Sequence, residues 1–302
     1  MDDLSLATPA TTGLATARPQ LATSADDAAL VDLWVRSKRK SAHTRSTYQR
    51  HGDRLLAHLA TRGLGLRQLS LDELLRFAES LGALSEGTQK NILAAVKSLL
   101  TFGQKSGYLP YNVGAALELS QPKNTLAERI LSEEQMQRML AMEDDPFKHL
   151  LIRVLYSSGG RISEVLAATW RDTAPNGKAG QITLLGKGGE TRVVKLSEST
   201  WHELRARRRP ADGPDAPIFA SKKGKPIARS WAWQIVKAAA VRAGLPADVS
   251  PHWMRHAHAS HALDRGAPAH LVKDTLGHAS LATTTKYAHA RPSESSSDYL
   301  AV

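Results

Sequence analysis

The sequence contains no cysteine, no hydrophobic run long enough to cross a bilayer and no N-terminal secretory signal. The absence of cysteine excludes disulfides, thiolate zinc sites and cysteine nucleophiles. The longest apolar run, residues 149–156, is interrupted by Arg153 and is far shorter than the roughly 20 residues of a membrane helix. The chain opens with Met1, Asp2 and Asp3 and lacks a basic region followed by an apolar one. We therefore expect a cytoplasmic protein without a membrane partner.

Positive charge is what the sequence has in excess. Forty Lys and Arg residues face 29 Asp and Glu residues, which gives a net charge of +11 and a pI near 9.9. A hydrophobic fraction of 42% over 302 residues is enough for two domains with their own cores. The charge predicts an anionic partner, and nucleic acid is favoured over a membrane surface.

The charge is uneven along the chain. Residues 1–30 carry −3, residues 31–60 carry +5 and residues 181–240 carry +7. Two basic blocks far apart in sequence fit a protein that grips a DNA duplex from two sides, and they also fit two unrelated solvated faces. The candidates for contacts with DNA phosphates are Lys38, Arg39, Lys40, Arg45 and Arg50 in the first block and Lys222, Lys223, Lys225 and Arg229 in the second.

The pattern of the chain predicts four parts. Residues 1–25 are rich in Ala, Thr and Ser and indicate a disordered leader. Residues 26–119 have helical periodicity and predict a helical domain. Residues 120–128 indicate a linker, and residues 129–302 a mixed domain in which a glycine-rich turn joins two short strands. The expected fold class is mainly α with a small β component.

Local signals mark several helix ends. Ser70 followed by Glu73 predicts a helix start with a capping hydroxyl and a carboxylate three residues later. Ser132 predicts a helix start after the linker, Pro251 fits the first turn of a helix, and Gly277 fits a helix stop.

Two candidate functional motifs come first in the mixed domain. Ser158-Gly-Gly-Arg161 opens a helix, where backbone N–H groups favour an anion, and Glu164 follows one turn later. A surface ion pair between Arg161 and Glu164 is the simpler interpretation. Lys187 lies in the turn between the predicted strands 181–185 and 191–196, where it could reach a phosphate, protonate a leaving oxygen or be an ordinary turn residue.

Three further candidates follow. His252 and Arg255 are three residues apart, which places them on one helix face. His278 comes directly after Gly277, and Tyr287 stands nine residues beyond it. Each of these residues alone is more simply explained as packing or a helix terminus.

Together these residues suit phosphoryl transfer. A tyrosine can attack a phosphodiester and form a covalent ester. Its pKa is about 10, so ionisation at pH 7 costs roughly 4 kcal/mol unless cations or a base offset it. Two arginines and one or two histidines could stabilise the charge of the transition state, and a lysine could protonate the departing sugar oxygen. The scheme needs no metal or cofactor, and the sequence contains no nucleotide-binding loop.

The five motifs, in this order and at this spacing, resemble those of the tyrosine recombinases, the phage-integrase and Xer family. The resemblance rests on Ser158-Gly-Gly-Arg-Ile-Ser-Glu164, Gly186-Lys-Gly188, His252-Trp-Met-Arg-His256, Leu276-Gly-His278 and the step to Tyr287. It covers nearly the whole chain after residue 25. It implies a helical, SAM-like core-binding domain and an α+β catalytic domain that together clamp DNA.

The resemblance also implies roles for residues. Tyr287 would be the nucleophile and form a 3′-phosphotyrosine link with a free 5′ hydroxyl. The groups that hold the phosphate would be Arg161, Arg255, His252 and His278, with Lys187 as the general acid and Glu164 as a support behind the first arginine. The family acts on double-stranded DNA with paired half-sites, works as a tetramer and passes through a Holliday junction. Homo-tetramers and hetero-tetramers with a related recombinase both remain open.

Some features depart from the family pattern. His258 stands where an aromatic or apolar residue is common, and Gly160 replaces a usual apolar residue, so local packing differs there. The segment after Tyr287 could dock on a neighbouring subunit through Tyr299 and Leu300, or it could be a frayed end.

Competing interpretations concern other residues. The pair His252 and His256 has a metal-like spacing, but no Glu lies between them, so no metal is expected. Trp231 and Trp233 are expected to pack in a core or between domains rather than stack on bases. The run Arg205, Arg207, Arg208 and Arg209 could be solvated or contact DNA.

Other protein classes fit part of the pattern. A non-catalytic DNA-binding regulator could share the scaffold but would lose Tyr287 or an arginine. A type IB topoisomerase uses similar chemistry without pairing two sites. Chromosome-dimer resolution, as in the Xer branch, and mobile-element integration are both open biological uses.

Overall fold

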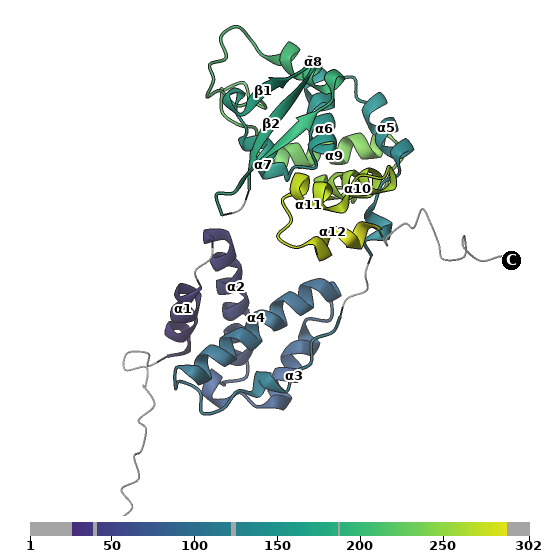
Figure 1. Cartoon of the computed structure of the whole chain (residues 1–302). Helices are drawn as coiled ribbons and strands as arrows, with labels where there is room; N and C mark the ends of the chain where they lie inside the picture. Colours follow the sequence, from purple (N-terminus) through teal and green to yellow (C-terminus); the bar gives the residue numbers. More distant parts are fainter. Residues whose placement is uncertain (1–25, 39–40, 122–124, 187, 289–302) are drawn as a thin grey trace, which may run out of the picture. The chain divides into compact units, whose positions relative to one another are not determined.

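The computed structural model describes residues 26–38, 41–121, 125–186 and 188–288 (Figure 1). The chain forms two compact units, residues 1–123 and 124–302. The first unit is helical, and the second combines helices with a small sheet. The expected class, mainly α with a small β component, is confirmed.

Over residues 26–38 and 41–121, the first unit contains four helices, α1 (Asp27–Ser37), α2 (Ala42–Ala60), α3 (Leu71–Ser80) and α4 (Glu86–Lys105), with short 3₁₀ turns at Leu66–Gln68 and Val113–Ala115. Side-chain oxygens of Asp26, Ser41 and Ser70 accept hydrogen bonds from the first turns of α1, α2 and α3. Apolar residues at helical spacing turn inward to form one core, which includes Leu30, Trp34, Leu55, Phe77 and Leu99.

The start of α3 differs from the expected cap in one respect. Ser70 Oγ accepts from the backbone N–H of Glu73 at 3.2 Å, as its hydroxyl predicts. The Glu73 carboxylate instead contacts His58 Nε2 at 2.9 Å and Arg62 Nε at 2.7 Å. This carboxylate is buried, and a cation from the neighbouring helix compensates it better than one backbone N–H would.

The second unit contains eight further helices and three strands in the described residues. The helices are α5 (Glu133–Ala141), α6 (Pro146–Ser158), α7 (Ile162–Ala167), α8 (Glu198–Arg207), α9 (Arg229–Arg242), α10 (Pro251–Asp264), α11 (Ala269–Leu276) and α12 (Leu281–Ala288), with 3₁₀ turns at Ala127–Arg129 and Trp170–Asp172. Ser132 caps α5, Pro251 opens α10 and Gly277 ends α11 with φ of 64°, as the sequence predicts.

The sheet is antiparallel in the order β1 (Thr173–Asn176), β2 (Ala179–Leu185) and β3 (Thr191–Leu196). The two predicted strands form β2 and β3, with Ile182 opposite Val194. Strand β1 was not predicted, because four residues that include a proline carry no alternating pattern. It forms at the edge of the sheet, where the N–H that Pro175 lacks is not needed for pairing with a further strand.

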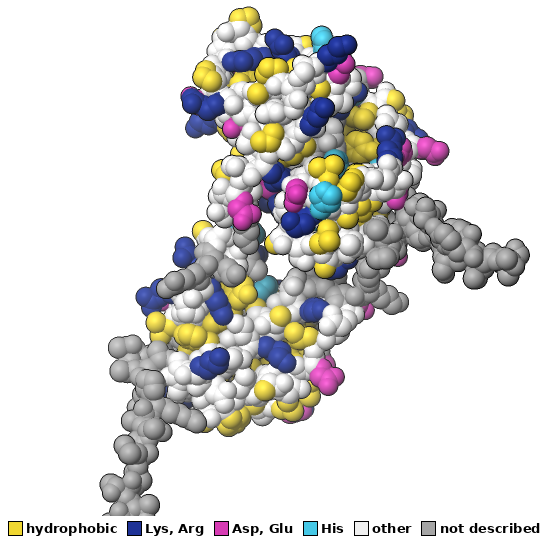
Figure 2. Space-filling model, viewed as in Figure 1, with side chains coloured by type: hydrophobic (Ala, Val, Ile, Leu, Met, Phe, Trp, Pro, Cys, Tyr) yellow, Lys and Arg dark blue, Asp and Glu magenta, His cyan; other side chains and the backbone are white. Residues whose placement is uncertain are grey.

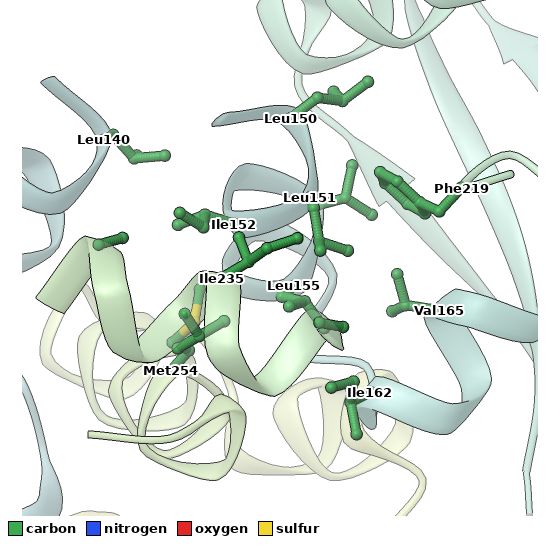
Figure 3. Close-up of a cluster of buried hydrophobic side chains, with 14 of the residues drawn as sticks. Leu140, Leu150, Leu151, Ile152, Leu155, Ile162, Val165, Phe219, Ile235 and Met254 are labelled. Atoms are coloured by element: carbon green, nitrogen blue, oxygen red, sulfur yellow. The ribbon is translucent and has the colours of Figure 1, made fainter. Parts of the chain in front are cut away.

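The core of the second unit surrounds α6. Helix α6 contacts α7, α9, α10 and strand β3. The buried cluster includes Leu151 and Leu155 of α6, Val165 of α7, Ile235 of α9 and Met254 of α10 (Figure 3). The first arginine motif lies between the end of α6 and the start of α7, and the motif of His252 and Arg255 lies in the first turns of α10.

None of the helices in the described part of the chain is both long enough and apolar enough to cross a membrane.

Candidate active site

The first arginine motif occupies a tight connection between α6 and α7. Gly159 ends α6 with φ of 57°, and a Cβ atom there would lie 2.7 Å from Leu276 Cδ2. A Cβ atom at Gly160 would lie 2.8 Å from side-chain carbons of both Leu184 and Val165. The glycine that departs from the family pattern therefore fills a position with no room for a side chain.

Arg161 stands at the N-terminus of α7 and is held by Glu164. Its Nη1 donates to Glu164 Oε1 at 2.7 Å, and its backbone N–H donates to Oε2 at 2.9 Å. The Arg161 side chain is 36% exposed, whereas that of Glu164 is 5% exposed. The expected ion pair is present, but it is not a surface pair, because the Glu164 carboxylate is buried while part of the Arg161 side chain stays exposed.

Arg255 links the first motif to the end of α11. Its Nη1 donates to the Gly159 carbonyl at 2.6 Å, and its Nη2 donates to the Leu276 carbonyl at 2.7 Å. Burial, followed by repulsion from Arg161 and Arg192, lowers the pKa of Arg255 to about 10, so it stays charged at neutral pH. One buried guanidinium brings three sequence motifs to one place.

The two candidate histidines differ in their surroundings. His252 lies on the exposed side of α10, and burial together with Arg229, Arg255 and Arg161 lowers its pKa. His278 is half-buried, and burial followed by Arg255 and Arg161 lowers its pKa to about 4. His278 Nδ1 lies 2.9 Å from the hydroxyl of Thr284. With that hydroxyl as donor, neutral His278 carries its proton on Nε2 and can donate it to an anion.

Tyr287, in α12, is only 5% exposed. Its hydroxyl lies 2.8 Å from His256 Nδ1, and its ring stacks on His278 with 6.2 Å between centroids. Burial raises the pKa of Tyr287, and the charge of Arg255 opposes that rise. Tyr287 belongs to a small buried apolar cluster that includes Val272 and Leu276.

His256 and Arg192 are site residues that the sequence reasoning did not select. Burial, followed by His252 and Arg255, lowers the pKa of His256 to about 4. Arg192, in β3, donates from Nη2 to Glu164 and from Nε to the Thr275 carbonyl, both at 2.6 Å. His256 follows the second arginine directly in sequence, which was the available signal. Arg192 had no signal, because only the fold places it beside Glu164.

A cavity of about 650 Å³ lies between the hairpin and the end of α11. Its lining includes Arg161, Gly186, Arg192, Lys273, Gly277 and His278, together with the carboxylates of Glu190 and Asp274. Lys273 pairs with Asp274 at 3.1 Å, so the groups in this lining that favour an anion are the two arginines and His278. Lys187 itself lies outside the described residues, although its neighbour Gly186 lines the cavity.

The other departure from the family pattern also has a packing role. His258 Nδ1 lies 2.8 Å from the carbonyl of Tyr156, and its ring lies against Gly159. The imidazole thus secures the last turn of α6, which an apolar residue would leave without this hydrogen bond.

The candidate DNA contacts lie on both units, where Figure 2 shows exposed Lys and Arg side chains. Arg45 and Arg50 are exposed on α2, and Lys38 bonds Ser98 at 2.8 Å; Arg39 and Lys40 lie outside the described residues. In the second unit, Lys222, Lys223, Lys225 and Arg229 are all exposed. The first three lie around a turn closed by the bond from Ser221 N–H to the Lys225 carbonyl at 2.7 Å.

The remaining candidates are packed against rings or acids. Arg205, Arg207 and Arg208 lie over Trp201, Phe147 and Trp170, and Arg209 pairs with Asp212. Trp233 packs against the core, while Trp231 is 41% exposed and stacks on Phe147. Within the described residues, no three His, Asp or Glu side chains are grouped so as to hold a metal ion.

Comparison with known proteins gives a consistent result. The family model described as "Phage integrase family" matches residues 129–294, and "Phage integrase, N-terminal SAM-like domain" matches residues 31–107. The tyrosine recombinase XerD of Mycobacterium tuberculosis is 31% identical over 272 residues, covering 82% of this chain and 87% of its own.

Solved structures have the same fold. The XerH site-specific recombinase in a post-cleavage complex with a palindromic difH substrate has a TM-score of 0.72 at 21% identity, covering 88% of this chain and 82% of its own. A lambda integrase tetramer bound to a Holliday junction has a TM-score of 0.67 at 16% identity, covering 83% of this chain and 77% of its own.

Proposed function

The chain belongs to the phage integrase family of tyrosine recombinases, and from that membership we propose that Tyr287 cleaves and rejoins DNA at a specific site. The observation that carries the assignment is the pair of bonds from Arg255 to the carbonyls of Gly159 and Leu276. These bonds unite the motifs of Arg161, Arg255 and His278 beside the helix of Tyr287. No metal or nucleotide is part of the proposal.

The phosphate is bound by cations and neutral N–H donors. Arg161 and Arg255 supply charge, and His252 and His278 supply imidazole donors on the same side of the unit. Glu164 orients Arg161 through two hydrogen bonds. Donors of this kind, aimed at a developing oxyanion, each contribute about 3–4 kcal/mol to transition-state stabilisation.

Cleavage replaces one phosphate ester by another, so the energy of the broken phosphodiester bond is kept in the phosphotyrosine link. Tyr287 Oη attacks the phosphorus, the P–O5′ bond breaks, and Lys187 protonates the departing 5′ oxygen. The phenol proton must leave Tyr287, and His256 Nδ1, at 2.8 Å, is the acceptor in contact with it. The 3′-phosphotyrosine then accepts a 5′ hydroxyl from a second strand, which reverses the same steps.

We assign roles to the two units on the same basis. Residues 26–119 form the core-binding domain and residues 129–302 the catalytic domain, with 120–128 as the linker between them. The exposed residues Arg45 and Arg50 on α2, and Lys222, Lys223 and Lys225 in the second unit, contact DNA phosphates.

The working assembly is a tetramer on two paired duplex sites in the cytoplasm. The lambda integrase tetramer on a Holliday junction supports this state through its common fold. Identity of 31% with an XerD protein favours an Xer-like role, either in a homo-tetramer or with a related recombinase.

Covalent trapping tests this function. The wild-type protein is incubated with nicked duplexes from a genomic pool, denatured, and examined for DNA-linked protein. We expect an adduct with the wild type and none with Tyr287→Phe, while duplex binding by Tyr287→Phe stays within about twofold because only a hydroxyl is lost.

Sequencing of the trapped fragments identifies the target site. Tyr108→Phe serves as the control variant, because it removes a tyrosine hydroxyl from the first unit, where it bonds Asp27. An adduct that persists in Tyr287→Phe would exclude Tyr287 as the nucleophile. Binding without an adduct in the wild type would favour a regulator or a requirement for a partner recombinase.

A further inference from the structure

Arg192 connects three parts of the site that are distant in sequence. It extends from β3, donates from Nη2 to Glu164 Oε2 and from Nε to the Thr275 carbonyl, and its side chain is only 12% exposed. Among the described residues, no hydrogen bond occupies its third nitrogen, Nη1, and the residue lines the cavity between the hairpin and the end of α11. A Cβ atom at Gly277 would lie 3.2 Å from this Nη1. The strand of the hairpin, the start of α7 and the end of α11 therefore meet at one guanidinium.

Glu164 is shared between two arginines. Oε1 accepts from Arg161 Nη1 at 2.7 Å, while Oε2 accepts from the Arg161 backbone at 2.9 Å and from Arg192 at 2.6 Å. Burial alone would raise the pKa of this carboxyl, but the hydrogen bonds from Arg192 and Arg161 outweigh burial and hold it below its usual value. Glu164 is therefore an anion at neutral pH.

Arg192 changes the net charge of the group that it forms with Glu164 and Arg161. With Arg161 alone, the buried carboxylate would neutralise the very cation that must meet the phosphate. With Arg192 present, the three groups keep a net charge of +1. Oε2 accepts from Arg192 and from the Arg161 backbone N–H, so the Arg161 guanidinium donates to the carboxylate only through Nη1. In the described residues, Nε and Nη2 of Arg161 have no intramolecular hydrogen bond and remain available to a ligand.

We propose that Arg192 is a positioning residue for strand cleavage, acting through Glu164 to orient the guanidinium of Arg161 toward the scissile phosphate. This inference rests on the proposed function. The competing role is mechanical: Arg192 could fix the hairpin and thereby place Lys187. The two roles differ in which catalytic step they assist, phosphate binding or protonation of the leaving group.

The first test uses the free protein and needs no DNA. The ¹⁵N and ¹H resonances of the arginine side chains report how freely each guanidinium rotates. We expect the Arg161 signals to be distinct in the wild type and averaged by rotation in both Arg192→Gln and Glu164→Gln. Lys195→Gln, an exposed cation of the same strand, is the matched control and should leave them unchanged. Unaltered Arg161 signals in a folded Arg192→Gln protein would overturn the proposal.

The second test uses duplexes of the trapped target sequence with sulfur in place of the bridging 5′ oxygen. A thiol ionises near pH 8.5, so this leaving group departs without a general acid. With ordinary DNA, we expect Arg192→Gln to slow cleavage about 100-fold, as for a mispositioned catalytic group. The sulfur substrate should restore cleavage by Lys187→Ala but not by Arg192→Gln. Restoration of Arg192→Gln would show that Arg192 acts through Lys187 and would overturn the proposal.

A third test compares the cleavage rates of the two single variants with that of the double variant. If Arg192 acts through Glu164, then Arg192→Gln combined with Glu164→Gln should cleave no more slowly than the slower single variant. Fully additive losses would contradict the proposal. Arg192→Lys keeps the charge but not both hydrogen bonds, and it should recover only part of the rate. If the wild type forms no adduct even when a related recombinase is added, the proposed function fails, while the resonance test still decides the role of Arg192.

Discussion

Histidines carry the pH response at the residue scale. Burial first, and neighbouring cations or imidazoles after it, lower the pKa of His256 and His278 to about 4; burial likewise lowers that of His258 to about 4, although its bond to the Tyr156 carbonyl opposes the shift. Their ordinary value is 6.5, so the unfolded chain binds protons that the folded chain does not. Stability contributed by these groups is complete above pH 6.5 and is lost as pH falls toward 4.

We expect the free energy of unfolding to decrease from pH 6.5 to pH 4.5. The slope should correspond to roughly two to three more protons bound by the unfolded chain than by the folded chain. Denaturant titrations at several pH values measure that slope. His278→Asn should reduce it by about one proton. A stability that stays constant over this range would show that these histidines are protonated in the folded state.

The candidate residues were predicted unevenly at this scale. Arg161, Arg255, His252, His278 and Tyr287 stand in local motifs, so order and spacing were enough to select them. Arg192 lies in strand β3 and has no local signal in the sequence, because only the fold places it beside Glu164. His256 directly follows Arg255 in sequence, but its contact with Tyr287 depends on the packing of α12. The sequence also gave no indication that Tyr287 is buried.

The junction between α6 and α7 is the critical point at the scale of elements. Gly159 adopts φ of 57°, and a Cβ atom there would lie 2.7 Å from Leu276 and 2.8 Å from His258. Gly177 adopts a similar φ of 62°, but nothing lies within 4 Å of its Cβ position. An alanine at Gly177 would therefore meet backbone strain alone, whereas an alanine at Gly159 would meet both strain and steric overlap.

We expect Gly177→Ala to lower the free energy of unfolding by about 1 kcal/mol, the strain of a left-handed residue. Gly159→Ala should add about 1–3 kcal/mol of overlap to that strain and should also lower the rate of adduct formation. Chemical denaturation and the trapping assay measure both effects. Equal losses at the two sites would mean that the junction tolerates a side chain.

Elements were predictable where a cap or an apolar stripe marks them. Ser132, Pro251 and Gly277 fixed helix ends through the backbone groups that each satisfies or omits. Strand β1 has no such mark, and it exists because β2 offers it a partner. Glu73 shows the converse, since its carboxylate pairs with His58 of α2 and with Arg62, which follows that helix, instead of returning to the cap of α3.

At the scale of the whole molecule, unpaired and paired cations should behave differently toward DNA. Lys222, Lys223 and Lys225 are exposed around one turn. Arg171, Arg209 and Arg265 are also at the surface, but each pairs with a carboxylate, of Asp215, Asp212 and Glu133 respectively. Counterion release depends on cations that neutralise phosphates, not on total charge.

We expect the affinity for duplex DNA to fall steeply and linearly with the logarithm of salt concentration. Replacement of the three lysines by Gln should lower that slope by up to about three units. The same replacement of the three paired arginines should change it little. A flat response in the wild type would mean that the basic blocks do not meet phosphate. Fluorescence anisotropy with a labelled duplex provides the measurement.

The two hydrogen bonds of Arg255 have a consequence for how this scaffold can lose activity. The carbonyls of Gly159 and Leu276 close the C-terminal ends of α6 and α11, where helix dipoles concentrate negative charge. One side chain therefore caps two helices and, in the proposed mechanism, also binds the phosphate. Removal of Arg255 would fray both helices, whereas removal of the Tyr287 hydroxyl takes away one hydrogen bond to His256. Descendants of such a protein that bind DNA without cutting it should accordingly lose the tyrosine first and keep the arginine.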